Sequence, residues 1–271
     1  MDCEPIAVLS DIHGNVRALD AVLAEIVRRG IRRVVNLGDC LYGPFDPRPA
    51  AERLIGLDIP TVSGNEDRIL IEGAAARRRS GRPSRRVSRT ASRPLSRTAA
   101  PPLSRVARFT RARLEPRHLA WLGSLPLTSI DGDALLCHGT PTDDTVYLLS
   151  RVSAGALAMR SGGEIDALLG SVAQRLVLCG HDHTQRLAVR GEQVIVNPGS
   201  VGCPAYVDDI PEDHVVENGS SPARFAVVHP ESEFHAAEWV AVPYDAPRAA
   251  AEARGNGFPE WAMWIATGRV R

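Results

Sequence analysis

The chain has 271 residues, of which 44% are hydrophobic and 24% charged, and its 32 basic residues, all arginine, balance 32 acidic ones. This length and composition allow a sizeable buried core, and the zero net charge points to neither nucleic acid nor membrane as a partner. No stretch approaches the ~20 apolar residues of a membrane-spanning helix, and the N-terminus lacks the basic and apolar regions of a secretory signal.

The first 62 residues alternate between strand and helix patterns. Three short apolar runs predict strands, at residues 6–9, 33–37 and 59–62. Apolar residues at helical spacing predict a helix over 15–29, which Gly30 ends, and 47–56 predicts a second helix with proline in its first turn. This order of elements indicates a right-handed parallel unit.

The next segment, 77–104, is rich in Arg, Ser, Pro, Thr and Ala and cannot bury enough apolar surface to offset chain entropy. Residues 77–113 hold 13 arginines and no acid, which leaves 32 − 13 = 19 arginines against 32 acids elsewhere. We expect a mobile Arg/Ser-rich insertion at 77–104 within a single domain spanning 1–271. Its arginines either attract a nucleotide or polyphosphate substrate or form a solvated variable loop, and we favour the loop because 77–108 lacks aromatic residues for base stacking.

The second half mixes further strands, helices and hairpins. Residues 105–124 predict helix, with a second short helix near Pro116. The remaining expected elements are strands at 134–137 and 175–179, a helix around 153–170, hairpins of 186–190 with 193–196 and of 224–229 with 235–242, and a helical tail at 246–268.

Five short motifs follow predicted strands, and ligands in open α/β sheets collect at the carboxyl ends of strands. The motifs are Asp11-x-His13, Gly38-Asp39, Gly64-Asn65, His138-Gly139 and Gly180-His181-Asp182-His183. They supply two aspartates, one asparagine and four histidines, which suit two transition-metal ions that share one aspartate. We expect manganese, with iron, zinc or nickel as alternatives. Paired ions of this kind usually act on phosphate esters.

The motifs resemble those of the calcineurin-like metallophosphoesterase superfamily, and within it the compact bacterial and archaeal phosphodiesterase branch. Segments 10–15, 37–39, 42–44, 180–184 and 197–202 carry the resemblance, which covers nearly the whole chain except the Arg/Ser segment. The resemblance implies a four-layer α/β/β/α sandwich with two mixed β-sheets. It also implies one metal held by Asp11, His13, Asp39 and His183, and a second held by Asp39, Asn65, His138 and His181, with Asp39 bridging.

The expected activity is hydrolysis of a phosphodiester by a hydroxide that bridges the two ions and attacks phosphorus in line. The ions would take most of the developing charge, and Asn65 and His138 would help to fix the second ion. The alternatives are a phosphomonoesterase or nucleoside-polyphosphate hydrolase, and a catalytically weak metal-bound scaffold or sensor. The complete ligand set argues against the scaffold. We expect a small phosphoester as substrate, no membrane partner, and leave the oligomeric state open.

Glu66 departs from the family pattern, which has histidine directly after the ligand asparagine. A carboxyl group beside two cations is ionised, so Glu66 would be a poor proton donor and would repel a dianionic monoester more than a monoanionic diester. We therefore expect a preference for diesters. The alternative is that Glu66 pairs with Arg68 or another arginine and faces away. The next residue, Asp67, is expected to orient a ligand histidine rather than to bind metal.

Five cysteines without a C-x-x-C pair indicate a reducing compartment, and we expect the cytoplasm. Cys40, Cys137 and Cys179 adjoin motif residues, and we interpret them as small apolar filler at strand ends rather than as metal ligands. Segment 197–200 either lines the site or forms a structural turn. No role is assigned to the histidines outside the motifs, which are His118, His214, His229 and His235.

Overall fold

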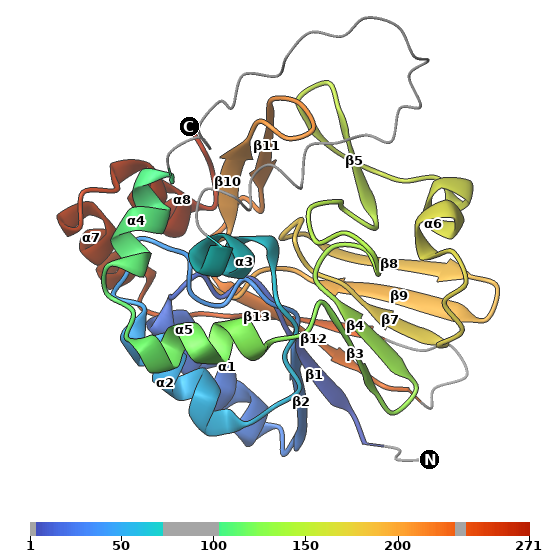
Figure 1. The fold of residues 1–271 in the computed structure, drawn as a ribbon. Coiled ribbons are helices and arrows are strands. Elements are labelled where there is room, and N and C mark those ends of the chain that lie inside the picture. The colour runs from blue at the N-terminus through green and yellow to red at the C-terminus, as the bar shows by residue number, and fades with distance from the viewer. Residues whose placement is uncertain (1–3, 73–102, 231–236) are drawn as a thin grey trace, which may run out of the picture.

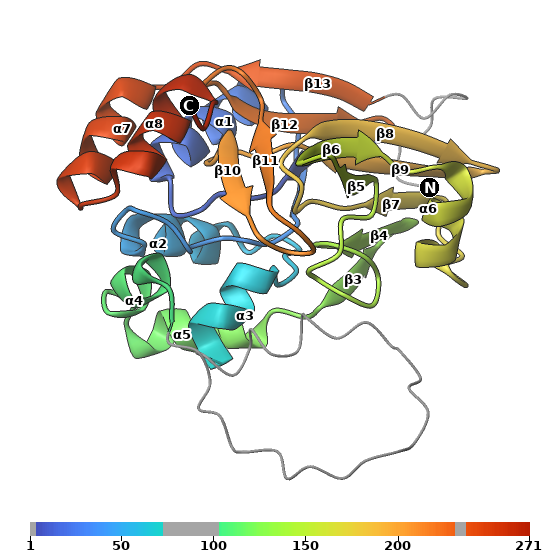
Figure 2. The ribbon, with the colours of Figure 1, turned by 90° about the horizontal axis from the view of Figure 1, so that it is seen from above.

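The computed structural model describes residues 4–72, 103–230 and 237–271. Most of the predicted Arg/Ser-rich insertion therefore lies outside the described residues. Two mixed β-sheets face each other at the centre, and helices cover the outer side of each sheet (Figures 1 and 2). The predicted four-layer α/β/β/α sandwich is confirmed.

The first sheet contains the N-terminal strand at its centre. Strand β1 is parallel to β2 and antiparallel to β12, which is in turn antiparallel to β13. The third strand expected at 59–62 is wrong, because this segment forms only an isolated parallel bridge between Asn36 and Thr61. The strands, in spatial order, are β13 (Ala237–Val242), β12 (Ala223–Val228), β1 (Ile6–Leu9) and β2 (Arg33–Asn36).

The second sheet is built from the middle of the chain. Its three inner strands, β4, β7 and β9, are parallel, and antiparallel strands β3 and β8 close its two edges. Strand β3 had no sequence prediction, whereas the other four strands were predicted. In spatial order the strands are β3 (Thr128–Asp131), β4 (Ala134–Cys137), β7 (Leu176–Leu178), β9 (Gln193–Pro198) and β8 (Gln185–Arg190).

Side chains alternate between the two faces of a strand, so one short apolar strand contributes both to the core between the sheets and to the core under the outer helices. In β1, Ile6 and Val8 pack between the sheets, while Ala7 and Leu9 face the outer helices. In the second sheet, Leu136 points into the space between the sheets and its neighbour Cys137 points outward. All four residues of β1 and of β4 are therefore buried.

Three helices cover the outer face of the first sheet, and α6 covers that of the second (Figure 1). Asn15 caps the first of them, since its side chain accepts a hydrogen bond from the backbone of Ala18. Ser161 and Glu164 form a reciprocal capping box at the start of α6. The helices are α1 (Val16–Arg28), α2 (Arg48–Leu57), α5 (Pro116–Ser124) and α6 (Gly162–Leu169).

Two predicted helices differ from the structure. The helix expected at 153–170 is a hairpin followed by a shorter helix, because Ala154 and Gly155 adopt positive φ values and turn the chain. The tail is two helices separated near Gly257, and both pack beside α4. These elements are β5 (Ser150–Ser153), β6 (Ala156–Met159), α4 (Arg105–Arg111), α7 (Ala246–Gly255) and α8 (Pro259–Thr267).

Three elements near the site had no sequence prediction. Helix α3 (Asn65–Glu72) begins at the motif asparagine, and a separate hairpin of β10 (Ala205–Asp208) with β11 (His214–Glu217) rises between α8 and β5 (Figure 1). Among the described helices, none combines the length and apolarity that a membrane span requires.

Candidate metal centre

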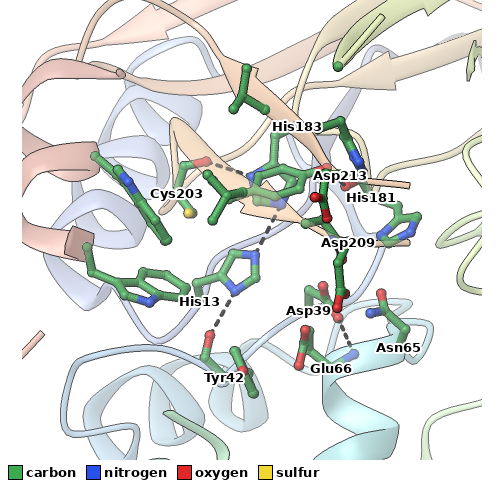
Figure 3. Close-up of a pocket in the computed structure, with 18 of the residues that line it drawn as sticks. His13, Asp39, Tyr42, Asn65, Glu66, His181, His183, Cys203, Asp209 and Asp213 are labelled. Atoms are coloured by element: carbon green, nitrogen blue, oxygen red, sulfur yellow. Dashed lines mark hydrogen bonds between the residues drawn. The ribbon is translucent and has the colours of Figure 1, made fainter. Parts of the chain in front are cut away.

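The motif side chains from both sheets meet where their strands end. Two groups form, one of Asp11, His13 and His183, and one of Asp39, His138 and His181, and within each group the potential ligand atoms lie within 4.8 Å of one another. The amide oxygen of Asn65 lies 3.0 Å from Nε2 of His138 and so joins the second group. The seven side chains that the sequence singled out thus converge, and Figure 3 shows five of them at the wall of one cavity.

Backbone groups fix the orientation of the imidazoles, and His181 has its backbone hydrogen bond at Thr145. The Nδ1–H of His13 donates to the carbonyl of Tyr42 at 2.8 Å, that of His138 to Leu37 at 2.8 Å, and that of His183 to Cys203 at 2.7 Å. A neutral ring that keeps its proton on Nδ1 presents Nε2 as the free base, which is the usual arrangement of a histidine that ligates a metal.

Five of the candidate ligands occupy a strained backbone conformation. Among the described residues, seven that are not glycine have positive φ, and five of them belong to the two groups. Left-handed φ values cost non-glycine residues free energy and concentrate at functional sites, where the surrounding structure enforces them. These residues are Asp11 (56°), His13 (51°), Asp39 (53°), His181 (73°) and His183 (54°).

The loops that follow β1 and β2 are joined to each other through their backbones. The amides of Asp11, His13 and Gly14 each donate to a carbonyl of segment 38–40 at 3.0 Å. Gly64 approaches the same loop so closely that an added Cβ would lie 2.1 Å from Oδ1 of Asp39. The motif glycine is therefore required for space beside the aspartate.

The atoms of the two groups that could bind a metal suit a cation. Oδ2 of Asp11 accepts a hydrogen bond from the amide of His181, but Oδ1 is buried and has no hydrogen-bond partner among the described residues. This oxygen lies 3.3 Å from Nε2 of His183 and 3.9 Å from Nε2 of His138. A buried acceptor without a donor is costly, and a cation between these atoms would satisfy it.

The electrostatics also favour positive charge at this place. Burial opposes charge on His138, yet the carboxylates of Asp39 and Asp11 raise its pKa to about 10. Burial and the neighbouring His138 lower the pKa of His181 to about 4. Although burial works in the other direction, His138 holds the pKa of Asp39 below its ordinary value. The carboxylates of Asp39 and Asp11 thus stabilise positive charge here, even on an imidazole that burial alone would keep neutral.

Asp67 holds two of the ligand loops together. Its Oδ1 accepts from the backbone amide of Cys40 at 2.9 Å and its Oδ2 from that of Gly64 at 3.1 Å. The expectation that Asp67 orients a ligand histidine is therefore corrected: it supports the loops that carry Asp39 and Asn65. Burial and then Asp39 raise the pKa of its carboxyl group to about 7.

Segment 197–203 connects the two sheets behind the site. The side chain of Asn197 donates to the carbonyl of Gly180 and to Asp182, and the hydroxyl of Ser200 donates to the carbonyl of Asp11. An added Cβ on Gly202 would lie 1.8 Å from the carbonyl oxygen of Ile12. Of the two readings of this segment the structural one holds, with the addition that the segment positions ligand-bearing loops.

Glu66 lines the cavity next to Asp39 and Asn65, as Figure 3 shows. Its backbone amide donates to Oδ1 of Asp39 at 2.9 Å. Arg68, which the alternative interpretation paired with Glu66, makes a two-pronged ion pair with Asp144 at 2.8 and 2.7 Å.

The cavity in front of the two groups has a volume of about 630 Å³ and includes residues that the sequence analysis did not single out. They come from the β10–β11 hairpin and from α8, neither of which contains a recognisable motif. His214, to which no role was assigned, also lines the cavity, and its Nε2 lies 2.9 Å from the hydroxyl of Tyr147.

The described cysteines behave as the apolar interpretation predicts. Cys40, Cys137, Cys179 and Cys203 are free and buried, and neither metal-ligand group contains a cysteine of the described residues. Burial raises the pKa of the Cys137 thiol to about 12. Such thiols are protonated at neutral pH and are poor metal ligands.

A two-sheet sandwich whose strand ends bring together two neighbouring His/Asp groups defines a metal-dependent hydrolase fold. The model of the calcineurin-like phosphoesterase superfamily domain matches residues 5–216. The chain belongs to this superfamily, whose members are phosphoester hydrolases that depend on two metal ions.

The comparisons with individual proteins agree with the fold. An uncharacterised protein of Methanocaldococcus jannaschii is 26% identical over 94% of both chains. A metallophosphoesterase from Sphaerobacter thermophilus superposes with a TM-score of 0.70 and 23% identity, covering 99% of this chain and 100% of that one. A hypothetical protein from Pyrococcus horikoshii gives a TM-score of 0.70, 18% identity and 98% coverage of both chains.

Proposed function

We propose that the protein is a phosphodiesterase that works with two divalent transition-metal ions, of which manganese is the first choice and iron, zinc and nickel are alternatives. The observation that carries the proposal is the pair of three-residue groups, which lie one beside the other, with Oδ1 of Asp11 in one group 3.9 Å from Nε2 of His138 in the other. When bound, such ions supply hydroxide at neutral pH and neutralise charge on the phosphoryl oxygens.

The chain would hold the two ions with different ligand sets. Asp11, His13 and His183 would bind one ion, and Asn65, His138 and His181 the other, with Asp39 shared between them. The amide oxygen of Asn65 brings no charge, which leaves the second ion more electrophilic than a third carboxylate would. The strained backbone and the carbonyl-bound rings hold these side chains ready before substrate arrives.

Glu66 supports diesters as the preferred substrates. From the cavity wall its carboxylate would face a phosphoryl group bound at the metal ions, and repulsion grows with the charge on the phosphate. A diester carries one negative charge where a monoester carries two near neutral pH. Glu66 also lacks the proton with which a histidine at this position would assist a poor leaving group.

Hydrolysis of p-nitrophenyl phosphate and bis(p-nitrophenyl) phosphate, each after chelation and Mn²⁺ add-back, tests the proposal. We expect the wild type to have the higher kcat/KM with the diester and Glu66→His to shift the ratio toward the monoester. A wild type that prefers the monoester contradicts the diester assignment. Protein that binds metal and turns over no phosphoester would instead be the scaffold or sensor.

We also infer a reducing compartment, such as the cytoplasm, because the four described cysteines are free.

A further inference from the structure

The cavity has two walls that the metal-ligand groups do not explain. One is aromatic and comes from α8, which contributes Trp261 and Trp264. The other is acidic and comes from the tip of the β10–β11 hairpin, which contributes Asp208, Asp209 and Asp213. Figure 3 shows Asp209 and Asp213 among the side chains in front of the metal-ligand groups.

The aromatic wall consists of two neighbouring indole rings. The rings of Trp261 and Trp264 lie 5.4 Å apart, and Trp261 meets the ring of His13 edge-on at 5.7 Å. Both side chains are more than nine-tenths buried, at 7% and 8% exposure, and the part of each that remains accessible borders the cavity.

The charges around the cavity are unusual for an enzyme that acts on phosphates. Outside the metal-ligand groups, its described lining contains four carboxylates, with Glu66 added to the three hairpin aspartates, and one arginine, Arg271. The formal balance is −4 + 1 = −3. Backbone amides of the hairpin tip occupy one carboxylate oxygen of Asp208, and Asp209 and Asp213 are exposed. This rim opposes polyphosphates and nucleic-acid strands.

We propose that the alcohol group of the substrate carries a cationic ammonium group, which Asp209 and Asp213 bind by charge and the Trp261–Trp264 wall binds through its ring faces. The proposal rests on the proposed function, because it names the substrate class of the same site. Indole faces and carboxylates together are the chemistry that recognises ammonium and quaternary ammonium ions.

Two substrates that differ only in charge test the proposal. p-Nitrophenyl phosphorylcholine carries a trimethylammonium group, and p-nitrophenyl 3,3-dimethylbutyl phosphate replaces its nitrogen with carbon. We expect wild-type kcat/KM to be about tenfold higher for the choline ester, the size of a desolvated cation–π or charge contact. The ratio should fall to near one in Asp209→Asn/Asp213→Asn. It should persist in Glu212→Gln, which removes a carboxylate of the same hairpin outside the cavity.

The proposal is overturned if the wild type has nearly the same kcat/KM for the choline ester and the dimethylbutyl ester. It is also overturned if the double variant keeps the wild-type ratio of these two values. A higher kcat/KM for p-nitrophenyl glyceryl phosphate than for the choline ester also overturns it, in favour of a polyol. If the double variant does not fold, Asp209→Asn and Asp213→Asn are measured singly, and each should lower the ratio.

A binding measurement separates this proposal from the proposed function. Choline should quench tryptophan fluorescence saturably in the chelator-treated wild type, while 3,3-dimethylbutanol should not, and Trp264→Phe should reduce the quenching. Saturable choline binding without turnover of any phosphoester would overturn the proposed function alone. Phosphodiester turnover without choline binding would overturn the ammonium assignment alone.

Discussion

The Nε2 atoms of His13 and His183 face each other at 3.2 Å. Both rings place their Nδ1–H on a backbone carbonyl, so in two neutral rings both facing atoms would carry lone pairs. The close contact therefore needs a positive charge, which is either a second proton on one ring or a metal ion. The pair, together with Oδ1 of Asp11, marks the position at which we expect one of the two ions.

Replacing one histidine of this pair should remove one ion. His183→Ala deletes a ligand of the first group and leaves the second group, around His138, with all its ligands. We expect elemental analysis after Mn²⁺ loading and dialysis to fall from about two ions per chain to about one. His181→Ala is the matched variant of the second group. Two ions retained in His183→Ala would show that this ring binds no metal.

A methyl group at Gly64 should disrupt the centre. The added Cβ would lie 2.5 Å from the backbone nitrogen of Asp39, which cannot move aside as a flexible side chain would. We expect Gly64→Ala to lose metal binding. Gly56→Ala, in helix α2 with open space around it, is the control and should raise the free energy of unfolding by about 0.5–1 kcal/mol. Wild-type metal content in Gly64→Ala would contradict the geometry.

Asp67 should support metal binding without touching an ion. In Asp67→Asn one carboxylate oxygen becomes an NH₂ group, which cannot accept from the amide of Cys40 or of Gly64. We expect a loss of about 1–3 kcal/mol in the free energy of unfolding of chelator-treated protein, and metal affinity about 10–100-fold weaker. Urea unfolding and calorimetric Mn²⁺ titration measure the two effects. The exposed Asp133→Asn serves as control, and equal values for both variants would rule out this role.

The ion pair of Arg68 with Asp144 should contribute to stability because it is two-pronged and its carboxylate is 7% exposed. It joins α3, which starts at Asn65, to the loop after His138. Asp144→Ala should lower the free energy of unfolding by about 2 kcal/mol, since Arg68 is itself partly exposed. Arg28→Gln, which breaks an exposed pair with Glu25, should leave the free energy of unfolding nearly unchanged. Equal effects would mean that the Arg68 pair acts only as a surface contact.

The sequence predicted the fold well, and it singled out the side chains that the two metal-ligand groups bring together, because the motifs stand directly after strands. The motif residues come from both sheets. They directly follow strands such as those that end at Leu9 and Cys137, so the strands set their positions and the conformation of the intervening loops has little effect. The 153–170 segment was mistaken for one helix because the turn depends on positive φ at Ala154, a residue that seldom adopts it.

The walls of the cavity could not be predicted in the same way. Trp261 and Trp264 lie in a tail whose pattern indicates only a helix, and the contact of Trp261 with His13 arises from tertiary packing. The acidic hairpin tip also has no motif, and only the folded structure shows that Asp209 and Asp213 line the cavity. Long-range packing of this kind leaves no periodic signal in a single sequence.

The most direct test of the central claim is the number of Mn²⁺ ions per chain in wild type and in Asp39→Asn, with diester hydrolysis measured on the same samples. We predict two ions and turnover in the wild type, at most one ion and at least a hundredfold lower kcat in Asp39→Asn, and wild-type behaviour in Asp133→Asn. Asp39→Asn protein that keeps two ions and full turnover would contradict a centre built around Asp39.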